Sequence, residues 1–223
     1  MGRTLWRRRE VVSGGVALLL AGSSWRLLAQ EKPDPEKGVT APEDLMREHG
    51  ILDRCLLVYE EGMRRLEMKQ EVAPEMFAET AEVVRRFVED YHEKNEETHV
   101  FPVFEKAGQH LELVRTLRRQ HDAGRRVTAE ILAIARSGKL AAVSAPCHAF
   151  IRMYRPHAAR EDTVLFPALR EILPPRKVEE MGDRMEESEQ KVLGKDGFEH
   201  FRDRVAALEE KLGIADLARF TPS

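Results

Sequence analysis

The sequence predicts an all-α protein, an up-down-up-down four-helix bundle over residues 42–172 with one or two extra helices in a C-terminal extension over residues 173–223. Of the 223 residues, 34% are charged and only 6% are aromatic, with many Glu, Arg, Leu and Ala. This composition favours a soluble helical domain over a sheet protein. Apolar residues recur at intervals of three and four along four long segments, as on helices with one buried face. The connections between these segments are short, which favours antiparallel neighbours.

The first helix is expected to begin at Pro42, a residue that suits a first helical turn. Leu45, His49, Leu52 and Leu56 then fall on one stripe. Gly138 is expected to end the third helix. Beyond Pro174 and Pro175, two further stretches have the charge pattern of surface helices packed on the bundle. We expect the remaining helices over residues 74–101, 109–137, 145–169, 177–193 and 197–212.

Residues 1–29 have the features of an export signal. Arg7, Arg8 and Arg9 precede the apolar run 16–21, which is too short for a membrane span, and Ala29 is a plausible cleavage point. The consecutive arginines resemble a twin-arginine signal. We therefore expect an exported, periplasmic protein with no transmembrane segment after cleavage, or a membrane-anchored one if the signal stays. Residues 30–41, rich in Pro, Glu, Lys and Gly, are predicted to form a linker.

Charge and cysteine content narrow the possible functions. The net charge of −3 argues against a nucleic-acid binder with a broad basic surface. Cys55 and Cys147 are too far apart for a zinc-finger pattern. A disulfide between them is possible in an oxidising compartment, but we favour buried free thiols.

The second and fourth predicted helices carry an internal repeat. HEKNEETHVFP begins at His92 and HAAREDTVLFP begins at His157. His, two acidic residues, Thr, Phe and Pro coincide at identical offsets. A lone histidine, His49 or His121, lies on the helix before each repeat. The chain is thus a pair of helices written twice.

Each repeat contains His-x-x-x-Glu, which places an imidazole and a carboxylate on the same face of a helix. One such pair is usually a surface hydrogen bond, but two copies with the same Phe-Pro ending favour a buried site. Buried carboxylates cost several kcal/mol unless cations neutralise them. Imidazole with carboxylate suits iron, manganese or zinc. We expect Glu96 and Glu161 to bridge two metals. His49 and His92 are expected on one metal, and His121 and His157 on the other. Each metal would keep open positions for oxygen, peroxide or an oxo bridge.

Over about residues 43–172 the chain resembles the hemerythrin HHE cation-binding family, in which a lone His and then a His-x-x-x-Glu pair occur twice, with Phe-Pro after each pair. The resemblance implies a hemerythrin-like four-helix bundle with a non-heme di-iron centre. Oxygen-carrying members have a further histidine where this chain has Arg125, and His-x-x-x-x-Asp where it has His157 and Glu161. These departures disfavour reversible oxygen carriage and favour reaction with oxygen or peroxide, sensing or iron handling. The ligands that the resemblance implies are His49, His92, Glu96, His121, His157 and Glu161.

Several other residues lie near the predicted site. His99 shares the inward face and is expected in the pocket wall, with direct ligation less favoured, whereas Glu93 is expected to be solvated. Tyr154 could donate a hydrogen bond into the oxygen pocket or serve core packing. Asp53 could orient His49 or form a surface ion pair with an arginine. The histidines expected to lie away from the site are His110, His148 and His200.

These features predict a di-iron protein that binds O2, peroxide or NO for binding, sensing or redox chemistry. One alternative is an enzyme that reduces peroxide or oxygen at the open site, with the metals as redox agents and no protein nucleophile. Another is an iron storage or delivery module. The sequence contains no docking motif that would identify a protein partner.

Overall fold

The computed structural model describes residues 39–222, and this part of the chain consists of helices and short loops without a strand. The predicted signal peptide lies outside the described residues, as does the predicted linker up to residue 38. Helix α1, Ala41–Glu67, begins one residue earlier than expected. The backbone N–H of Thr40 donates to the Glu43 carboxylate 3.0 Å away, which stabilises the first turn.

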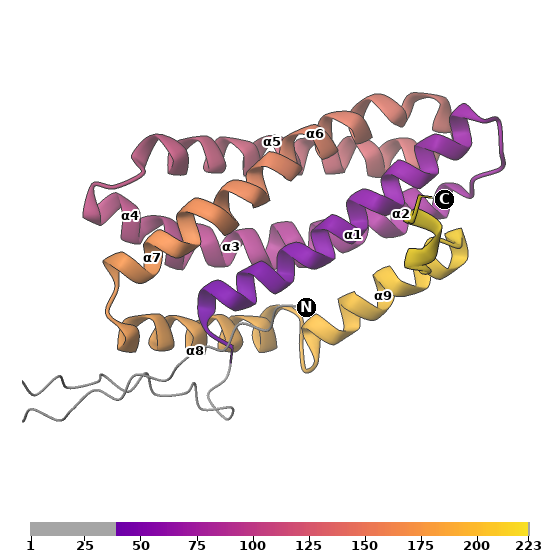
Figure 1. Cartoon of the computed structure of the whole chain (residues 1–223). Helices are drawn as coiled ribbons and strands as arrows, with labels where there is room; N and C mark the ends of the chain where they lie inside the picture. The colour runs from indigo at the N-terminus through magenta and orange to yellow at the C-terminus, as the bar shows by residue number, and fades with distance from the viewer. Residues whose placement is uncertain (1–38, 223) are drawn as a thin grey trace, which may run out of the picture. The chain divides into compact units, whose positions relative to one another are not determined.

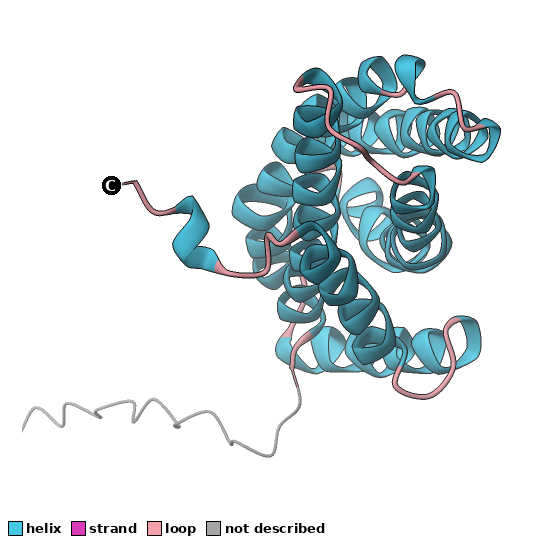
Figure 2. Ribbon diagram, turned by 90° about the vertical axis from the view of Figure 1, so that its right-hand side faces the viewer, coloured by secondary structure: helices cyan, strands magenta, loops and turns pink. Residues whose placement is uncertain are grey.

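Four long helical rods lie alongside one another (Figure 1), and the view along them shows them packed together (Figure 2). The first rod is α1 and the third is α5, Leu111–Ser137, which ends at Gly138 as predicted. The second rod extends to Ala107, six residues beyond the expected end, and the fourth runs from Ser144 to Ile172. The second rod comprises α2 (Pro74–Val83), α3 (Glu93–Asn95) and α4 (Phe101–Ala107), and the fourth comprises α6 (Ser144–Arg160) and α7 (Phe166–Ile172).

Wide π-helical turns interrupt the second and fourth rods. They span Val84–His92, Glu96–Val100 and Glu161–Leu165. Two of these turns come directly before a Phe-Pro pair at equivalent places in the repeat, and each proline lies in the first turn of the next α-helix. Proline has no N–H and its ring collides with a carbonyl one turn back, so a widened turn accommodates it. The repeated Phe-Pro therefore accounts for a repeated distortion beside the two glutamates of the motif.

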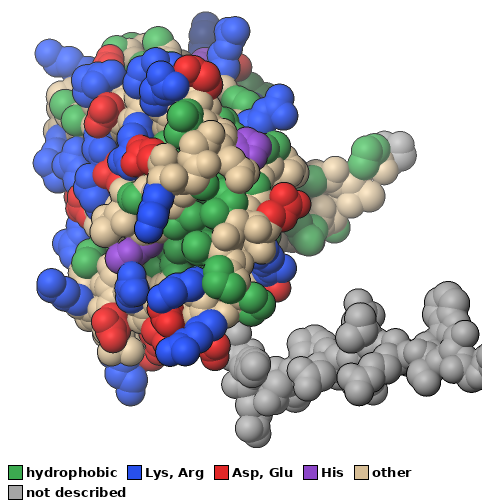
Figure 3. All heavy atoms as spheres, turned by 90° about the vertical axis from the view of Figure 1, so that its left-hand side faces the viewer, with side chains coloured by type: hydrophobic (Ala, Val, Ile, Leu, Met, Phe, Trp, Pro, Cys, Tyr) green, Lys and Arg blue, Asp and Glu red, His purple; other side chains and the backbone are tan. Residues whose placement is uncertain are grey.

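The buried apolar residues form two clusters. The larger cluster contains residues from the later turns of α1, from α2, from the end of α5, from the start of α6 and from helix α9. The smaller cluster contains residues from the first turns of α1, from α4, from the start of α5, from α7 and from helix α8. Figure 3 looks at the end of the bundle where α4 and α7 end, and apolar side chains lie there between scattered Lys and Arg side chains. Members of the smaller cluster include Leu45, Phe101, Phe104, Leu117, Phe166 and Met181.

Two C-terminal helices, α8 (Pro175–Val192) and α9 (Gly197–Leu212), pack on the rods. Helix α9 does more than cover the surface, because Phe201 and Val205 enter the larger apolar cluster. Arg54 of α1 also donates to the Glu209 carboxylate, with 2.9 Å between Nε and Oε1. None of the described helices is long and apolar enough to cross a membrane. Cys55 and Cys147 are buried free thiols, as we favoured.

Candidate metal centre

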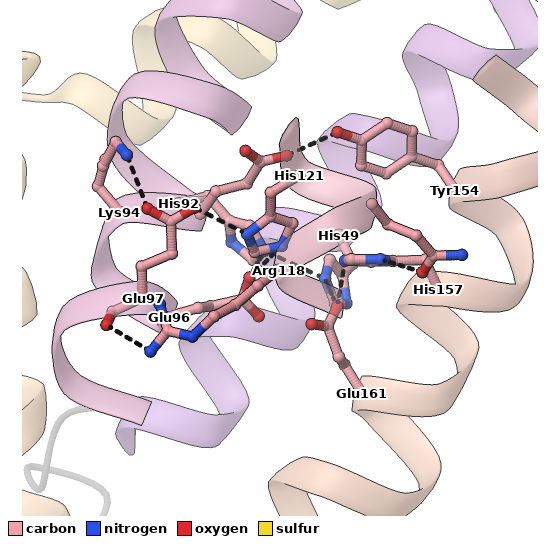
Figure 4. Close-up of polar contacts among 12 residues, drawn as sticks. His49, His92, Lys94, Glu96, Glu97, Arg118, His121, Tyr154, His157 and Glu161 are labelled. Carbon is pink, nitrogen blue, oxygen red and sulfur yellow. Dashed lines mark hydrogen bonds and ion pairs between the residues drawn. The ribbon is translucent and has the colours of Figure 1, made fainter. Parts of the chain in front are cut away.

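The structure brings the six residues expected from the repeat into one buried group between the rods (Figure 4). Each rod supplies one histidine, and the second and fourth rods also supply the glutamates from their π-helical turns. No member is more than 3% exposed. The six residues are His49 of α1, His92 and Glu96 of the second rod, His121 of α5, and His157 of α6 with Glu161.

Each glutamate lies between histidines from two different rods. Glu161 Oε2 is 3.4 Å from His49 Nε2 and 3.0 Å from His157 Nε2. Glu96 Oε2 is 3.6 Å from His92 Nε2 and 3.4 Å from His121 Nε2. Each carboxylate therefore touches one histidine from each half of the repeat, so both stand at positions where they could bridge two cations.

In the first half of the repeat, both imidazoles are oriented by carboxylates. Asp162 Oδ1 lies 2.7 Å from His49 Nδ1, and Glu48 Oε2 lies 2.6 Å from His92 Nδ1. A carboxylate at Nδ1 fixes the ring orientation and leaves Nε2 free as a donor atom. The His49 and His92 Nε2 atoms consequently face each other at 3.1 Å.

In the second half the same arrangement recurs with different chemistry. Glu97 Oε1 lies 3.1 Å from His121 Nδ1, and the amide oxygen of Gln120 lies 3.0 Å from His157 Nδ1. Glu97 and Asp162 directly follow the glutamates of the His-x-x-x-Glu pairs, whereas Glu48 and Gln120 directly precede the lone histidines. The metal-ligand motif alone did not identify these four partners, although their equivalent positions in the two halves are a visible signal in the sequence.

The phenylalanines of the two Phe-Pro pairs cover the lone histidines. The ring of Phe166 stacks on His49 with 5.6 Å between centroids, and Phe101 stacks on His121 at 5.5 Å. These contacts place an apolar wall beside each imidazole. The repeated phenylalanine thus packs directly on the group.

The donor atoms of this group fit cations. Both carboxylate oxygens of Glu96 and Glu161, together with His121 Nε2, are buried without a hydrogen-bond partner. Such atoms lose their hydration without compensation unless an ion takes its place. Two overlapping sets have ligand atoms within 4.8 Å of one another: Glu96, His121, His157 and Glu161 in one, and His49, His92 and Glu96 in the other.

The two glutamates also influence each other's protonation. Burial, followed by the charge of Glu161, holds the pKa of Glu96 well above its usual value of 4.5. Burial opposes ionisation of Glu161 as well, but His157 and His49 more than compensate and lower its pKa. In the absence of a cation, these effects favour the protonated form of Glu96 and the ionised form of Glu161. Cations between them would favour both carboxylates in their charged form.

Arg125, where oxygen carriers have a further histidine, forms ion pairs with carboxylates. Its Nη2 lies 2.8 Å from Glu93 Oε2 and 2.5 Å from Glu97 Oε1. Glu93 also accepts a hydrogen bond of 2.6 Å from the Tyr154 hydroxyl. A chain of polar contacts thus runs from Tyr154 through Glu93, Arg125 and Glu97 to His121.

The structure corrects the expectation for one neighbouring residue, Glu93, and bears on those for His99 and Asp53. Glu93 was expected in solvent, yet it is 1% exposed. His99 is half-buried and joins none of the candidate metal groups in residues 39–222. The burial of Glu93 is explained by the π-helical turns, which change the rotation per residue and so break the regular 3.6-residue assignment of faces. Asp53 is exposed, and Asp162 rather than Asp53 contacts the His49 ring.

Other expected positions agree with the structure. The Tyr154 side chain is 1% exposed and packs at 5.3 Å from the His157 ring, although its hydroxyl bonds to Glu93 and not into an open pocket. His110, His148 and His200 are exposed.

The chain matches a known domain family and is similar in sequence to known mycobacterial proteins. A family model, the hemerythrin HHE cation binding domain, matches residues 40–169. Uncharacterized protein Rv1995 of Mycobacterium tuberculosis is 45% identical over 199 residues, which cover 86% of this chain and 77% of that protein. Uncharacterized protein Mb2018 of Mycobacterium bovis matches with the same identity and coverage. No solved structure matches the chain significantly. Because the family model spans more than half of its residues, the chain belongs to the hemerythrin HHE cation-binding domain family.

Proposed function

We propose that this protein binds two iron ions in the buried centre and interacts there with O2, peroxide or NO, in binding, sensing or redox chemistry. One observation carries the proposal: the Glu96 and Glu161 carboxylates are buried without hydrogen-bond partners, each between imidazole nitrogens of two rods. Carboxylates in that setting need cations. Four imidazoles and two carboxylates without a thiolate suit iron.

The proposed ligands follow the two halves of the repeat. Bound iron would supply a redox-active cation with coordination positions that the protein leaves open for a small ligand. The chain's own contribution is to hold the imidazoles with Nε2 inward and to exclude water with Phe101 and Phe166. One ion would be held by His49 and His92, the other by His121 and His157, with Glu96 and Glu161 shared between them.

The proposal includes the up-down-up-down order of a four-helix bundle over residues 42–172, with α8 and α9 as a C-terminal extension. Two contacts support this order. The first turns of α1 share the smaller apolar cluster with α4, the start of α5 and α7, at the far ends of the second and fourth rods. The last turns of α1 share the larger cluster with α2, the end of α5 and the start of α6.

Metal analysis of the purified chain tests the proposal. After anaerobic loading with Fe²⁺ and gel filtration, we expect two irons per chain, and exposure to O2 should produce ferric charge-transfer absorption in the near ultraviolet. Glu96→Ala and Glu161→Ala should lose bound iron. His148→Ala, which changes an exposed histidine, should keep both ions. A wild-type chain that takes up no iron would refute the proposal.

A second candidate is an enzyme that reduces peroxide or oxygen. It is favoured by Arg125, which pairs with Glu93 and Glu97 and so supplies no ligand to the ion beside His121. That ion would keep more open positions. Steady-state peroxide consumption should then continue for many turnovers, survive in His148→Ala and vanish in Glu161→Ala. A single stoichiometric oxidation would leave binding or sensing as the function.

We also propose export through a twin-arginine signal in residues 1–29. The proposal rests on Arg7, Arg8 and Arg9 ahead of the apolar run 16–21. Cell fractionation should find the chain in the periplasm, and lysine substitution of the three arginines should retain it in the cytoplasm. An unchanged distribution would contradict this signal type.

A further inference from the structure

The two halves of the repeat place different charges behind their histidines. Behind His49 and His92 lie two carboxylates, those of Asp162 and Glu48. Among the described residues, neither carboxylate forms an ion pair with a lysine or arginine; each pairs only with its histidine. Glu48 is 3% exposed, so solvent screens its charge poorly. This half of the repeat thus offers its two imidazoles carboxylate partners that no described lysine or arginine neutralises.

Behind His121 and His157 the negative charge is smaller. Gln120, which takes the place of Glu48, is a neutral amide. Glu97, which takes the place of Asp162, shares its charge with two cations. Arg125 lies 2.5 Å from its Oε1, and Lys94 Nζ lies 2.6 Å from its Oε2. The approximate two-fold symmetry of the ligands is therefore broken in the residues that orient them.

This difference acts on metal affinity through a known effect. A carboxylate that accepts the Nδ1–H of a metal-binding histidine makes Nε2 a stronger donor, and loss of such a partner typically costs about 10- to 100-fold in affinity. A neutral amide fixes the ring with less gain in basicity. A carboxylate already paired with Arg and Lys likewise offers less charge to the imidazole.

We infer that the two metal positions are unequal, and that the position held by His49 and His92 fills first and binds more tightly than the one held by His121 and His157. The inference rests on the proposed two-metal function and adds an order of loading to it. Glu48 and Gln120 act as positioning residues that set this order, since they occupy equivalent places and differ in charge.

Anaerobic titration of the metal-free full-length chain with Co²⁺, followed by calorimetry and by the visible Co²⁺ spectrum, tests the inference. The wild type should bind two ions in two steps whose dissociation constants differ by about 10-fold or more. Glu48→Gln should weaken the tighter step by about 10- to 100-fold and leave the weaker one nearly unchanged. Gln120→Glu should strengthen the weaker step, so that the two steps approach each other.

Two further variants keep the test independent of folding defects at positions 48 and 120. Arg125→Gln releases Glu97 from one of its cations and should strengthen the weaker step without changing a histidine partner. Glu112→Gln removes an exposed charge on the same helix as Gln120 and should alter neither step. Circular dichroism of each variant should be used to check that it is folded.

The outcomes separate the inference from the proposed function. Two ions bound with equal affinity by the wild type would overturn the inference and leave the two-metal function intact. A Glu48→Gln effect on the weaker step would also overturn it, because the order would then be reversed. Absence of any bound ion would overturn both.

Discussion

The polar layer around the candidate metal centre and the apolar clusters of the bundle are equally buried, but they are stabilised in opposite ways. Phe77 and Phe104 in the clusters are 0% exposed, and so are Glu96 and His121 in the layer. Burial of an apolar side chain stabilises the fold by about 25 cal/mol per Å². Burial of an unpaired carboxylate destabilises it by several kcal/mol.

This contrast indicates that the two regions contribute to stability with opposite signs. The clusters, to which α8 and α9 contribute Met181 and Phe201, provide the net stability. The polar layer between the rods lowers the net stability, because four carboxylate oxygens there have no hydrogen-bond partner. We therefore expect substitutions in the two regions to respond differently to metal.

Metal loading should have the largest effect. Because the folded chain presents the ligands together and the unfolded chain does not, each occupied position should stabilise the fold by about 3–4 kcal/mol at metal concentrations of roughly 100–1,000 times the dissociation constant. Thermal denaturation of the Zn²⁺-loaded and chelator-treated chain measures this difference. An unchanged melting temperature would mean that the polar layer is stable without ions.

Removal of a large apolar side chain should have the next largest effect on stability. Phe77→Ala, in the larger cluster, should lower the free energy of unfolding by about 3–5 kcal/mol with and without metal. Phe101→Ala should cost a similar amount and also reduce the metal-dependent gain, since Phe101 stacks on His121. Urea unfolding of both variants in both states makes the comparison. If the loss of stability in Phe77→Ala depended on metal, the apolar cluster and the polar layer would not be independent in stability.

The sequence predicted the polar layer better than its surroundings. All six residues of the repeat meet in the structure because an i, i+4 pair on a regular helix shares a face, and the π-helical turns leave each His and Glu close to one another. The same turns made the assignment of Glu93 wrong, since a position between the pair rotates to a new direction.

Contacts between segments that are distant in the sequence could not be predicted from the sequence patterns. Asp162 reaches His49 across 113 positions of the chain, and only the packing of the rods decides that Asp162 rather than Asp53 contacts that ring. Helix α9 had the charge pattern of a surface helix, yet Phe201 reaches the larger cluster. Amphipathic periodicity identifies the face that is buried but not the partner that covers it.

The stability of the metal-free chain should also depend on pH, by less than the effects of metal loading and of Phe77→Ala. This dependence should originate in the polar layer. Burial raises the pKa of Glu48 from 4.5 to about 7. The folded chain therefore retains a proton that the unfolded chain releases, so stability falls as pH rises from about 4.5 to about 7, by up to about 3 kcal/mol. Glu48→Gln lacks this proton and should lose less stability across the range.

Urea unfolding with a chelator at about pH 5 and about pH 8 measures the effect. The advantage of Glu48→Gln over the wild type should be greater at the higher pH. Glu112→Gln, on an exposed carboxylate, should follow the wild type at both. An equal difference between wild type and Glu48→Gln at the two pH values would show that Glu48 titrates normally.

The smallest effect concerns a glycine beside the polar layer. A Cβ at Gly124 of α5 would come within 2.7 Å of Tyr154 Cζ, and the Tyr154 hydroxyl is held by Glu93. Gly124→Ala should therefore destabilise the chain by about 1–3 kcal/mol through overpacking. Gly50→Ala in α1, with nothing within 4 Å of the new Cβ, should instead stabilise it by about 0.5–1 kcal/mol through better helix propensity. Urea unfolding of the two variants should give opposite signs; two stabilised variants would show that Tyr154 moves freely, and that the polar contacts from Tyr154 to His121 are not fixed by packing.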